Sequence, residues 1–512
     1  MKLTDLLLPG EYEGTLPDAE ITEIVNDNER IVPGCLFVCH EGARFDSHSL
    51  LPTLSGRGCV AAVVQAGKAV PDIPFPVVRV PDTRLAEALI ANRMAGEPGK
   101  KLTMIGVTGT NGKTSVSFML HRLFCDAHIP CGLIGTLGFF GAREKENAFT
   151  GFHTGNAATM TTPPPLTLYP LLAAMVESGI THVVMEVSSQ GLIASRVAPL
   201  HFSLSVFTNL SPEHLDAHKT MGNYLAAKSV LFRQTDIAVV NGDSPWSDLL
   251  LDRLPCKRIS CSTVRSSDAE AVDVRLLGSE GVSYIYRTRE RSFPVTVPVP
   301  GEFAVQNSLL ALTAALSLGV DPGTAKRSIA VLPPIPGRME RIDTGDFPFS
   351  VFIDYAHTEA ALRSLLRTVR GFRSKNERIV LLFGCGGDRD KTKRAEMGRV
   401  AEELADFTVV TSDNSRSEDP KRIILDILSG MKNQRRRLVI LNRERAIRYL
   451  ILSAEPGDVI LLVGKGHEKY EITKDGSRPF DEKKIVLSAL EERRAGHTIK
   501  DLGHADQLRD ST

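Results

Sequence analysis

The apolar residues in the middle of the chain form short, nearly unbroken runs separated by longer segments with helical spacing. The runs read LTMIGV (102–107), THVVMEV (181–187), FSLSVFTNL (202–210) and IAVVN (237–241). Strands of a parallel sheet give such runs because helices bury both faces of the sheet. A helical pattern, TLYPLLAAMVESG (167–179), separates the first two runs. The pattern therefore predicts an α/β fold with a mostly parallel central sheet.

The two ends of the chain repeat this pattern on a smaller scale. Near the N-terminus it predicts strands at 33–38 and 59–64 and a helix at 83–96. Near the C-terminus, strands are predicted at RIVLLFG (378–384), FTVVTSD (407–413) and DVILLVG (458–464). A polar loop follows each of these last three strands, which is where doubly wound sheets bind their ligands. The last block is therefore predicted to be a Rossmann-like sheet with a ligand site at its edge.

Two segments rich in Gly and Pro, GEPGKK (96–101) and VLPPIPGR (331–338), are predicted to be linkers. Before the second linker, residues 270–300 alternate like antiparallel strands, and a helix is predicted at 304–319. The chain has 512 residues, and domains of ~100–200 residues suggest about three of them. The expected domains are 1–98, 99–334 and 335–512.

Composition narrows the possible functions. Lys plus Arg and Asp plus Glu both number 61, and this zero net charge disfavours a general nucleic-acid binder. No apolar run approaches the ~18–20 residues that cross a bilayer, and the N-terminus lacks a signal-peptide pattern. The eight cysteines lack zinc-site spacing and are expected to be reduced, mostly buried thiols. We therefore expect a cytoplasmic protein that does not insert into membranes. A monomer is expected as well, although none of these features bears on the oligomeric state.

The segment GVTGTNGKTSV (106–116) joins a predicted strand to a predicted helix. Its spacing differs from the common phosphate loop, because Val107 replaces the first glycine and the additional glycine is Gly109. Backbone amides up to Gly112 can still wrap a phosphate at the helix N-terminus. Lys113 can reach the terminal phosphates, and Thr114 can offer a hydroxyl to Mg²⁺. The loop predicts a nucleoside triphosphate site and leaves the reaction open.

Other polar residues follow neighbouring strands of the same block. Glu186 and Ser188 end one strand, where a carboxylate suits Mg²⁺. His214 follows another strand and is either a functional or a structural histidine. Lys228 lies in a predicted helix among apolar residues. By pattern alone, Lys228 is most simply a surface lysine with a buried apolar stem.

In the last block, Arg389, Arg416 and Glu468 each lie just past a predicted strand. Two guanidinium groups and a carboxylate form a suitable receptor for a zwitterion such as an amino acid. Each residue alone would also suit a surface ion pair. Their shared placement at strand ends favours a binding site.

These segments occur in the order typical of the Mur ligases. The chain resembles that family over nearly its whole length, and within it the branch that adds a diamino acid. The resemblance rests on GTNGKT (109–114), TTP (161–163), MEVSS (185–189), NLSPEHLD (209–216), AAKSVLF (226–232), GRME (337–340), DYAHT (354–358), FGCGGDRD (383–390) and GKGHE (464–468).

The resemblance implies an ATP-dependent amide ligase of peptidoglycan precursor synthesis. ATP would activate the γ-carboxylate of D-Glu in UDP-MurNAc-L-Ala-D-Glu as an acyl phosphate. The amine of a diamino acid would displace the phosphate, giving ADP, phosphate and a UDP-MurNAc-tripeptide. The three predicted domains would bind the UDP-sugar, ATP and the amino acid, in chain order.

The resemblance also implies individual roles. Lys113, Lys228 and His214 would be catalytic. The ATP contacts would be Gly109, Thr110, Asn111, Gly112, Lys113, Thr114, Ser115, Asn307 and Arg338. Mg²⁺ would be held by Thr114, Glu186, His214 and Lys228, the last as a carbamate, which replaces the surface interpretation. The UDP-sugar peptide would contact Thr161, Thr162, Ser188 and Arg196. The diamino acid would contact Arg389, Asp413, Asn414, Ser415, Arg416, Gly464 and Glu468.

The identity of the diamino acid depends on Arg416. Diaminopimelate differs from lysine by a distal carboxylate, which a guanidinium group can bind through two hydrogen bonds. Family members that add diaminopimelate usually carry Asp-Asn-Pro-Arg, whereas this chain has Ser415 in place of the proline and keeps the arginine. We therefore expect meso-diaminopimelate, with L-lysine or another diamino acid as the alternative.

Several residues depart from the family pattern. Asn28 and Glu29 replace Ser and Arg of an N-terminal Asp-Ser-Arg, which would alter the uridine pocket. Gln190, Ala194 and Glu213 replace a His, a Gln and an Asp. Rival interpretations are a folylpolyglutamate synthetase, a sister ligase that adds D-Ala-D-Ala, and a nucleotide-binding scaffold without activity. The N-terminal block disfavours the first and Arg416 the second. The scaffold is disfavoured by the intact set Lys113, Glu186, His214 and Lys228.

Overall fold

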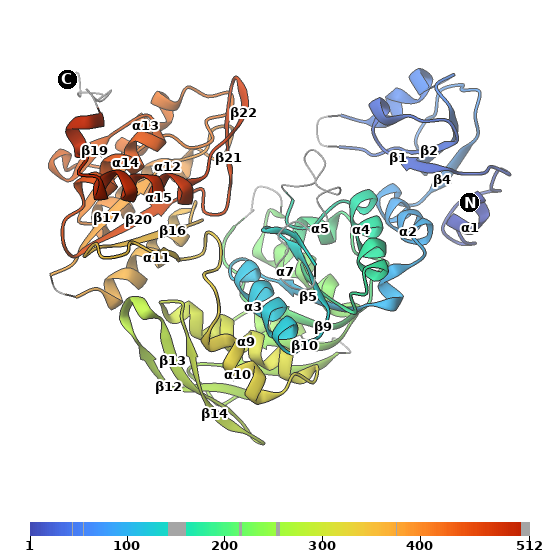
Figure 1. Ribbon diagram of the computed structural model, residues 1–512. Helices are drawn as coiled ribbons and strands as arrows, with labels where there is room; N and C mark the ends of the chain where they lie inside the picture. Colours follow the sequence, from blue (N-terminus) through green and yellow to red (C-terminus); the bar gives the residue numbers. More distant parts are fainter. Residues whose placement is uncertain are drawn as a thin grey trace. The chain divides into compact units, whose positions relative to one another are not determined.

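The computed structural model describes residues 1–42, 45–54, 56–141, 160–213, 218–251, 256–374 and 376–502. The chain divides into two compact units. The first comprises Met1–Val272, Tyr286–Phe293 and Gln306–Ile329, and the second comprises Asp273–Ile285, Pro294–Val305 and Ala330–Thr512. Helices pack on mostly parallel sheets in both units (Figure 1). The predicted α/β fold class is confirmed.

A small parallel sheet lies near the start of the first unit. Its strands, in spatial order, are β1 (Glu23–Val25), β2 (Cys35–Val38), β3 (Cys59–Gln65) and β4 (Val77–Val80). The short helix α1 (Leu3–Leu6) precedes them, and α2 (Thr83–Met94) follows. The side chain of Asp82 caps α2 by accepting hydrogen bonds from the backbone amides of Arg84 and Leu85. The strands and the helix predicted here from the sequence are therefore confirmed.

The large sheet has ten strands in the order β14-β13-β12-β11-β10-β9-β5-β8-β6-β7. The predicted apolar runs form its parallel centre, namely β5 (Thr103–Thr108), β8 (His182–Glu186), β9 (Phe202–Phe207) and β10 (Thr235–Asn241). The other strands are β6 (Cys131–Gly135), β7 (Gly138–Phe140), β11 (Lys257–Ser262), β12 (Ala269–Leu276), β13 (Val282–Thr288) and β14 (Ser292–Val297). The last three confirm the strands predicted at 270–300.

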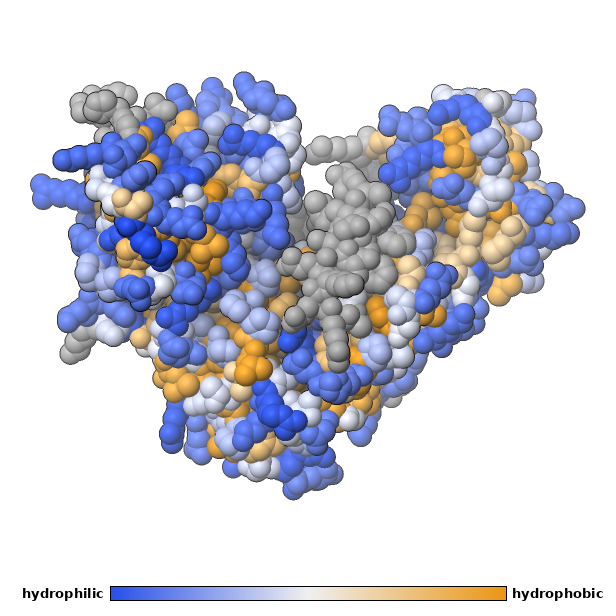
Figure 2. Space-filling model, in the orientation of Figure 1, coloured by the Kyte–Doolittle hydropathy of each residue, from blue (hydrophilic) through white to orange (hydrophobic). Residues whose placement is uncertain are grey.

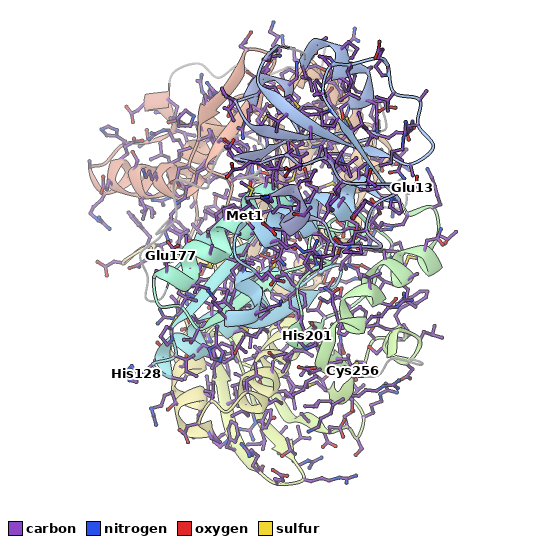
Figure 3. The ribbon with its side chains drawn as sticks, turned by 90° about the vertical axis from the view of Figure 1, so that its right-hand side faces the viewer. Met1, Glu13, His128, Glu177, His201 and Cys256 are labelled. Carbon is purple, nitrogen blue, oxygen red and sulfur yellow. The ribbon has the colours of Figure 1, made fainter. Side chains whose placement is uncertain are left out.

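The helices of this block connect the ends of the strands. They are α3 (Lys113–Asp126), α4 (Pro165–Glu177), α5 (Ser189–Ile193), α7 (Met221–Arg233), α8 (Ser247–Leu251), α9 (Glu302–Ser317) and α10 (Pro322–Ala330). His128 and Glu177 are exposed where α3 and α4 end and the next strands are about to begin (Figure 3). They therefore mark the amino edge of the sheet. The predicted ATP-site loop between β5 and α3 lies at the opposite, carboxyl edge, where ligands of such sheets bind.

The second unit contains a six-stranded sheet in the order β15-β16-β20-β17-β18-β19. Only β15 (Glu340–Ile342) runs antiparallel to its neighbour β16 (Ser350–Asp354). The remaining strands are β17 (Arg378–Phe383), β18 (Phe407–Val410), β19 (Arg437–Val439) and β20 (Asp458–Val463). Because β20, β17 and β18 are parallel neighbours, the polar loops that follow them share one edge. A separate hairpin joins β21 (Tyr470–Thr473) to β22 (Gly476–Pro479).

Helices cover both faces of this sheet. Leu381 and Phe383 belong to the core under α11 (Glu359–Phe372), α12 (Thr392–Leu404) and α13 (Pro420–Leu428). Val380 and Leu382 point to the opposite core, under α14 (Arg443–Ser453) and α15 (Glu482–Arg494). This alternation along one buried strand explains its unbroken apolar sequence.

Hydrophilic side chains cover most of the face shown in Figure 2, with smaller apolar groups between them. Among the described residues, no helix has both the length and the apolar character needed to cross a membrane. All eight cysteines lie in the described ranges as reduced thiols, and seven of them are buried. Burial raises the pKa of the Cys261 and Cys385 thiols to about 12. These thiols are therefore unreactive and pack as small apolar side chains.

Candidate active site

The loop between β5 and α3 is held in a shape that only glycine permits. Gly109 has a φ of +149°, and a Cβ atom there would lie 1.9 Å from Oγ1 of Thr208. Gly112 has a φ of +85°, and its Cβ would lie 2.6 Å from Oδ1 of Asn307. The predicted ATP contact Asn307, on α9, therefore packs against the loop. Both glycines therefore allow the loop backbone to pack closely against Thr208 and Asn307.

The segment after β9 supports the same loop through hydrogen bonds. The backbone amide of Thr110 donates to the carbonyl of Asn209 at 2.9 Å, and the amide of Asn111 donates to Oδ1 of Asn209 at 2.9 Å. The side chain of Thr208 donates to the carbonyl of Asn111 at 2.5 Å. These bonds preorganise the loop. Sequence reasoning did not assign Asn209 a role, although it stands directly after a strand in the quoted segment NLSPEHLD.

Two lysine amines meet at one carbonyl of the loop. Nζ of Lys113 donates to the carbonyl oxygens of Gly109 and Thr110, both at 2.9 Å. Nζ of Lys228, on α7, donates to the Gly109 carbonyl at 2.9 Å. Lys228 is 1% exposed, and burial, followed by the nearby charge of Lys113, lowers its pKa well below the usual value. The interpretation of Lys228 as a surface lysine, drawn from the pattern alone, was therefore wrong.

Glu186 lies buried at the end of β8, beside the first turn of α3. Its carboxylate accepts hydrogen bonds from the hydroxyl of Thr114 at 3.1 Å and from the backbone amide and hydroxyl of Thr136 at 2.9 and 3.1 Å. Thr136 follows β6 and was not among the sequence candidates. Its residue type carries no signal, and only the β6–β8 pairing brings it to Glu186.

This oxygen set suits Mg²⁺. The ion takes one or two protein carboxylates and leaves positions for water and substrate phosphates. Glu186 and the Thr114 hydroxyl supply such ligands at the start of the phosphate loop helix. Within the described ranges, no three His, Cys, Asp or Glu side chains form a larger metal cluster. The predicted ligand His214 lies outside the described residues.

The residues predicted to contact the UDP-sugar peptide are next to Glu186. The hydroxyl of Thr162 donates to the Glu186 carbonyl at 3.0 Å, and the backbone amide of Ser188 donates to Oγ1 of Thr162 at 2.9 Å. Oγ1 of Thr161 is 3.1 Å from Oγ1 of Thr136. Nη1 of Arg196 donates to the Thr162 carbonyl at 2.5 Å. All four predicted residues therefore form one hydrogen-bonded group beside the phosphate loop.

The second unit has its own cluster of buried polar residues after β18 and β20. Nδ2 of Asn414 donates to Oε2 of Glu468 at 2.8 Å. Burial, followed by the charge of Asp413, raises the pKa of Glu468. Burial also opposes ionisation of Asp413, but the charges of Arg443 and Lys465 outweigh it and lower the Asp413 pKa. Gly464 is required here, because a Cβ atom would lie 2.8 Å from Oδ2 of Asp413.

Arg416 connects the loops that follow β17 and β18. Its Nη1 donates to the carbonyl of Gly387 at 2.9 Å and to that of Asn414 at 3.3 Å. A Cβ atom on Gly386 would be 3.0 Å from Nη1 of Arg416 and 3.9 Å from Cγ of Arg389. Ser415 is buried and Arg389 is exposed. The predicted amino-acid contacts thus lie at the carboxyl edge shared by β20, β17 and β18.

The predicted ATP contact Arg338 also lies in the second unit. Its guanidinium group stacks over the ring of Tyr355 at 4.8 Å from the ring centre. The backbone amide of Tyr355 donates to the Gly337 carbonyl at 3.0 Å. The quoted segments GRME and DYAHT are therefore neighbours in space.

Comparison with known proteins identifies the family. Residues 107–315 match the family model of the Mur ligase middle domain, and residues 337–466 match that of the Mur ligase, glutamate ligase domain. A UDP-N-acetylmuramoyl-L-alanyl-D-glutamate--2,6-diaminopimelate ligase of Syntrophomonas wolfei is 36% identical, covering 96% of this chain and 99% of that protein. The chain belongs to the Mur ligase family.

Other relatives agree with this assignment. The Geobacillus thermodenitrificans protein of the same name is 37% identical, over 96% of this chain and 100% of its own length. A solved structure of a ligase with that name has 28% identity and a TM-score of 0.67, covering 97% of this chain and all of that one. A Mycobacterium tuberculosis folylpolyglutamate synthase has 18% identity and a TM-score of 0.59, covering 81% of this chain and 95% of its own. It shares the fold alone.

Proposed function

We propose that this Mur ligase adds meso-diaminopimelate to the D-Glu γ-carboxylate of UDP-MurNAc-L-Ala-D-Glu in the cytoplasm, with consumption of ATP. A carboxylate oxygen attacks the γ-phosphorus of ATP and ADP leaves. The amine then attacks the acyl carbon, phosphate leaves, and the amine loses a proton. One observation carries the proposal. The Lys113 and Lys228 amines meet at the Gly109 carbonyl, in a phosphate loop of the Mur ligase form.

The phosphate loop performs the first step by positioning and charge. Its backbone amides hold the phosphates, and Lys113 stabilises the negative charge that develops during transfer. Glu186, Thr114 and His214 would hold Mg²⁺, which would supply positive charge beside the phosphate oxygens. Thr161, Thr162, Ser188 and Arg196 would keep the acceptor carboxylate next to the loop.

The burial of Lys228 supports its proposed carbamate. A neutral amine can attack CO₂, forming an N–C bond and releasing one proton, whereas an ammonium ion cannot. The lowered pKa of Lys228 favours the neutral amine. The resulting anion would lie beside the Lys113 cation and would supply oxygen ligands for a second Mg²⁺.

We also propose a role for each block of the chain. Residues 1–98 bind the UDP-sugar, 99–334 bind ATP, and 335–512 bind the diamino acid. In the last block, Glu468 would receive an ammonium group and Arg416 the distal carboxylate. Arg389, Asp413, Asn414, Ser415 and Gly464 would shape this pocket, and Arg338 with Asn307 would contact the nucleotide.

The decisive experiment measures phosphate release from ATP with UDP-MurNAc-L-Ala-D-Glu and either meso-diaminopimelate or L-lysine. We expect release with diaminopimelate only, together with a tripeptide product of the corresponding mass. Release with L-lysine alone would support the ligase activity but would overturn the assignment of diaminopimelate as the substrate. A third reaction with a folate and L-glutamate tests the folylpolyglutamate alternative, and no release is expected.

Replacement of Glu186 by Gln is expected to lower kcat/KM by at least about 10- to 100-fold, the loss that even outer partners of metal sites cause. The glutamine keeps the shape, its oxygen can accept from the Thr136 backbone amide, and its NH₂ group can donate to the hydroxyls of Thr114 and Thr136, so the fold should persist. The variant should also need more Mg²⁺ for half-maximal activity. Glu177→Gln, at the exposed end of α4, is the matched control and should behave as wild type. An unchanged Mg²⁺ titration in Glu186→Gln would exclude Glu186 from the metal site.

A further inference from the structure

Lys465 is a fully buried lysine beneath the amino-acid pocket. It is 0% exposed, so its amine cannot touch a substrate. Nζ donates to Oδ1 of Asn414 and to the carbonyl of Tyr470, both at 2.9 Å. It also lies 3.9 Å from Oδ1 of Asp413. Burying a charged amine costs desolvation free energy, even when acceptors surround it. This cost indicates that Lys465 has a role beyond packing.

The bond from Lys465 fixes the orientation of the Asn414 side chain. Oδ1 of Asn414 faces two groups that can only donate, the Lys465 amine and the backbone amide of Ile472 at 2.9 Å. A flipped amide would put its NH₂ against both of these donors. Nδ2 is therefore forced toward Glu468, to which it donates at 2.8 Å. The orientation of Asn414 thus sets the position of the Glu468 carboxylate.

The charge of Lys465 also balances two carboxylates. Burial and the neighbouring charge of Asp413 raise the pKa of Glu468, and burial also opposes ionisation of Asp413. Lys465 opposes this for both carboxyl groups. Asp413 is further balanced by Arg443, whose Nη1 is 4.0 Å from Oδ2. The other charged or titratable groups that act on Glu468 are Arg416, Tyr355 and Tyr470.

We infer that Lys465 is a positioning residue that, through Asn414, holds Glu468 in the orientation that receives the ammonium group of the incoming amino acid. The inference rests on the proposed function and adds a residue to it. Lys465 acts through Asn414, Asp413 and Glu468, which all belong to the proposed amino-acid pocket. Its removal should therefore affect the amino-acid substrate and spare ATP and the UDP-linked dipeptide.

The test is Lys465→Met, which keeps the apolar stem and removes the charge and donors. KM for meso-diaminopimelate should rise about 10- to 100-fold, the loss expected when hydrogen bonds from a charged donor are removed. KM for ATP and for the UDP-linked dipeptide should stay within about twofold of wild type. Lys474→Met removes a charge from the turn of the exposed hairpin and should change nothing. Equal increases in all three KM values would overturn the inference.

A double-mutant cycle with Glu468→Gln sharpens the test. If Lys465 acts through Glu468, the second substitution should add little in either background, because coupled residues are not additive. Independent, additive effects would contradict the inference. Lys465→Gln, which retains a donor, replaces Lys465→Met in the cycle if thermal unfolding shows that the methionine variant is not folded.

A crystal structure of the variant separates this inference from the proposed function. Loss of the Asn414–Glu468 hydrogen bond or reorientation of the Asn414 amide supports the inference, whichever substrates the wild-type enzyme accepts. Unchanged positions of both side chains would overturn it. Failure of the wild-type enzyme to release phosphate with any diamino acid would count against the proposed function alone.

Discussion

Replacement of Lys113 by methionine is expected to lower kcat by about 10²- to 10³-fold, the cost of losing one preorganised donor to developing charge. In the structure, the Lys113 amine donates to the carbonyls of Gly109 and Thr110 at 2.9 Å. Both carbonyls belong to the loop that would surround the phosphates. The Lys113 cation therefore already lies where negative charge would develop on the transferred phosphoryl group. Methionine keeps the apolar stem of the side chain and removes only the charge and its hydrogen bonds.

The measurement is ATP-dependent phosphate release at saturating concentrations of all three substrates. Lys326→Met, at an exposed position of α10, is the matched control and should keep wild-type kcat. Thermal unfolding of both variants should be compared, because Lys113 also connects two carbonyls of the loop. A Lys113→Met enzyme that folds and turns over at the wild-type rate would mean that the loop does not hold the reacting phosphates.

The sequence predicted the regular part of the fold well, because burial on both faces of a parallel sheet leaves a local signature. The runs at 181–187 and 202–210 became β8 and β9, with ends within a few residues of the prediction. The loop at 106–116 was recognisable because glycine and lysine are required at fixed spacing there. Each of these signals is local in the chain.

Long-range pairing explains what the sequence could not predict. The sequence around Thr136 gives no sign of a role, and its contact with Glu186 results from the pairing of β6 with β8. Lys465 stands in the quoted GKGHE segment, but its role depends on Asn414, which is 51 residues away. The pattern alone predicted a surface position for Lys228, whereas in the fold its amine donates to the Gly109 carbonyl. The sequence pattern identified candidate residues at strand ends. Only the fold shows which hydrogen-bond and charge partners surround these residues.

Replacement of Arg416 by methionine is expected to lower kcat/KM for meso-diaminopimelate by about 10²- to 10³-fold, because two hydrogen bonds to a charged group are lost. In the described part of the chain, the guanidinium group uses Nη1 to bind the carbonyls of Gly387 and Asn414. The donors on Nε and Nη2 remain for the distal carboxylate of the substrate. Arg416→Lys should recover only part of the loss, because an ammonium group cannot form the paired bonds.

L-Lysine separates this clamp from the structural role of Arg416. The bonds from Nη1 hold the loops after β17 and β18 together, so any loosening of these loops should weaken both amino acids equally. Loss of the clamp should weaken only diaminopimelate, since lysine has no distal carboxylate. The ratio of kcat/KM for diaminopimelate to that for lysine should therefore fall by about the full 10²- to 10³-fold in Arg416→Met, and stay unchanged in Arg422→Met, at an exposed position of α13. An equal decrease in kcat/KM for both amino acids would mean that Arg416 only holds the two loops together. Other residues would then determine the selectivity for diaminopimelate.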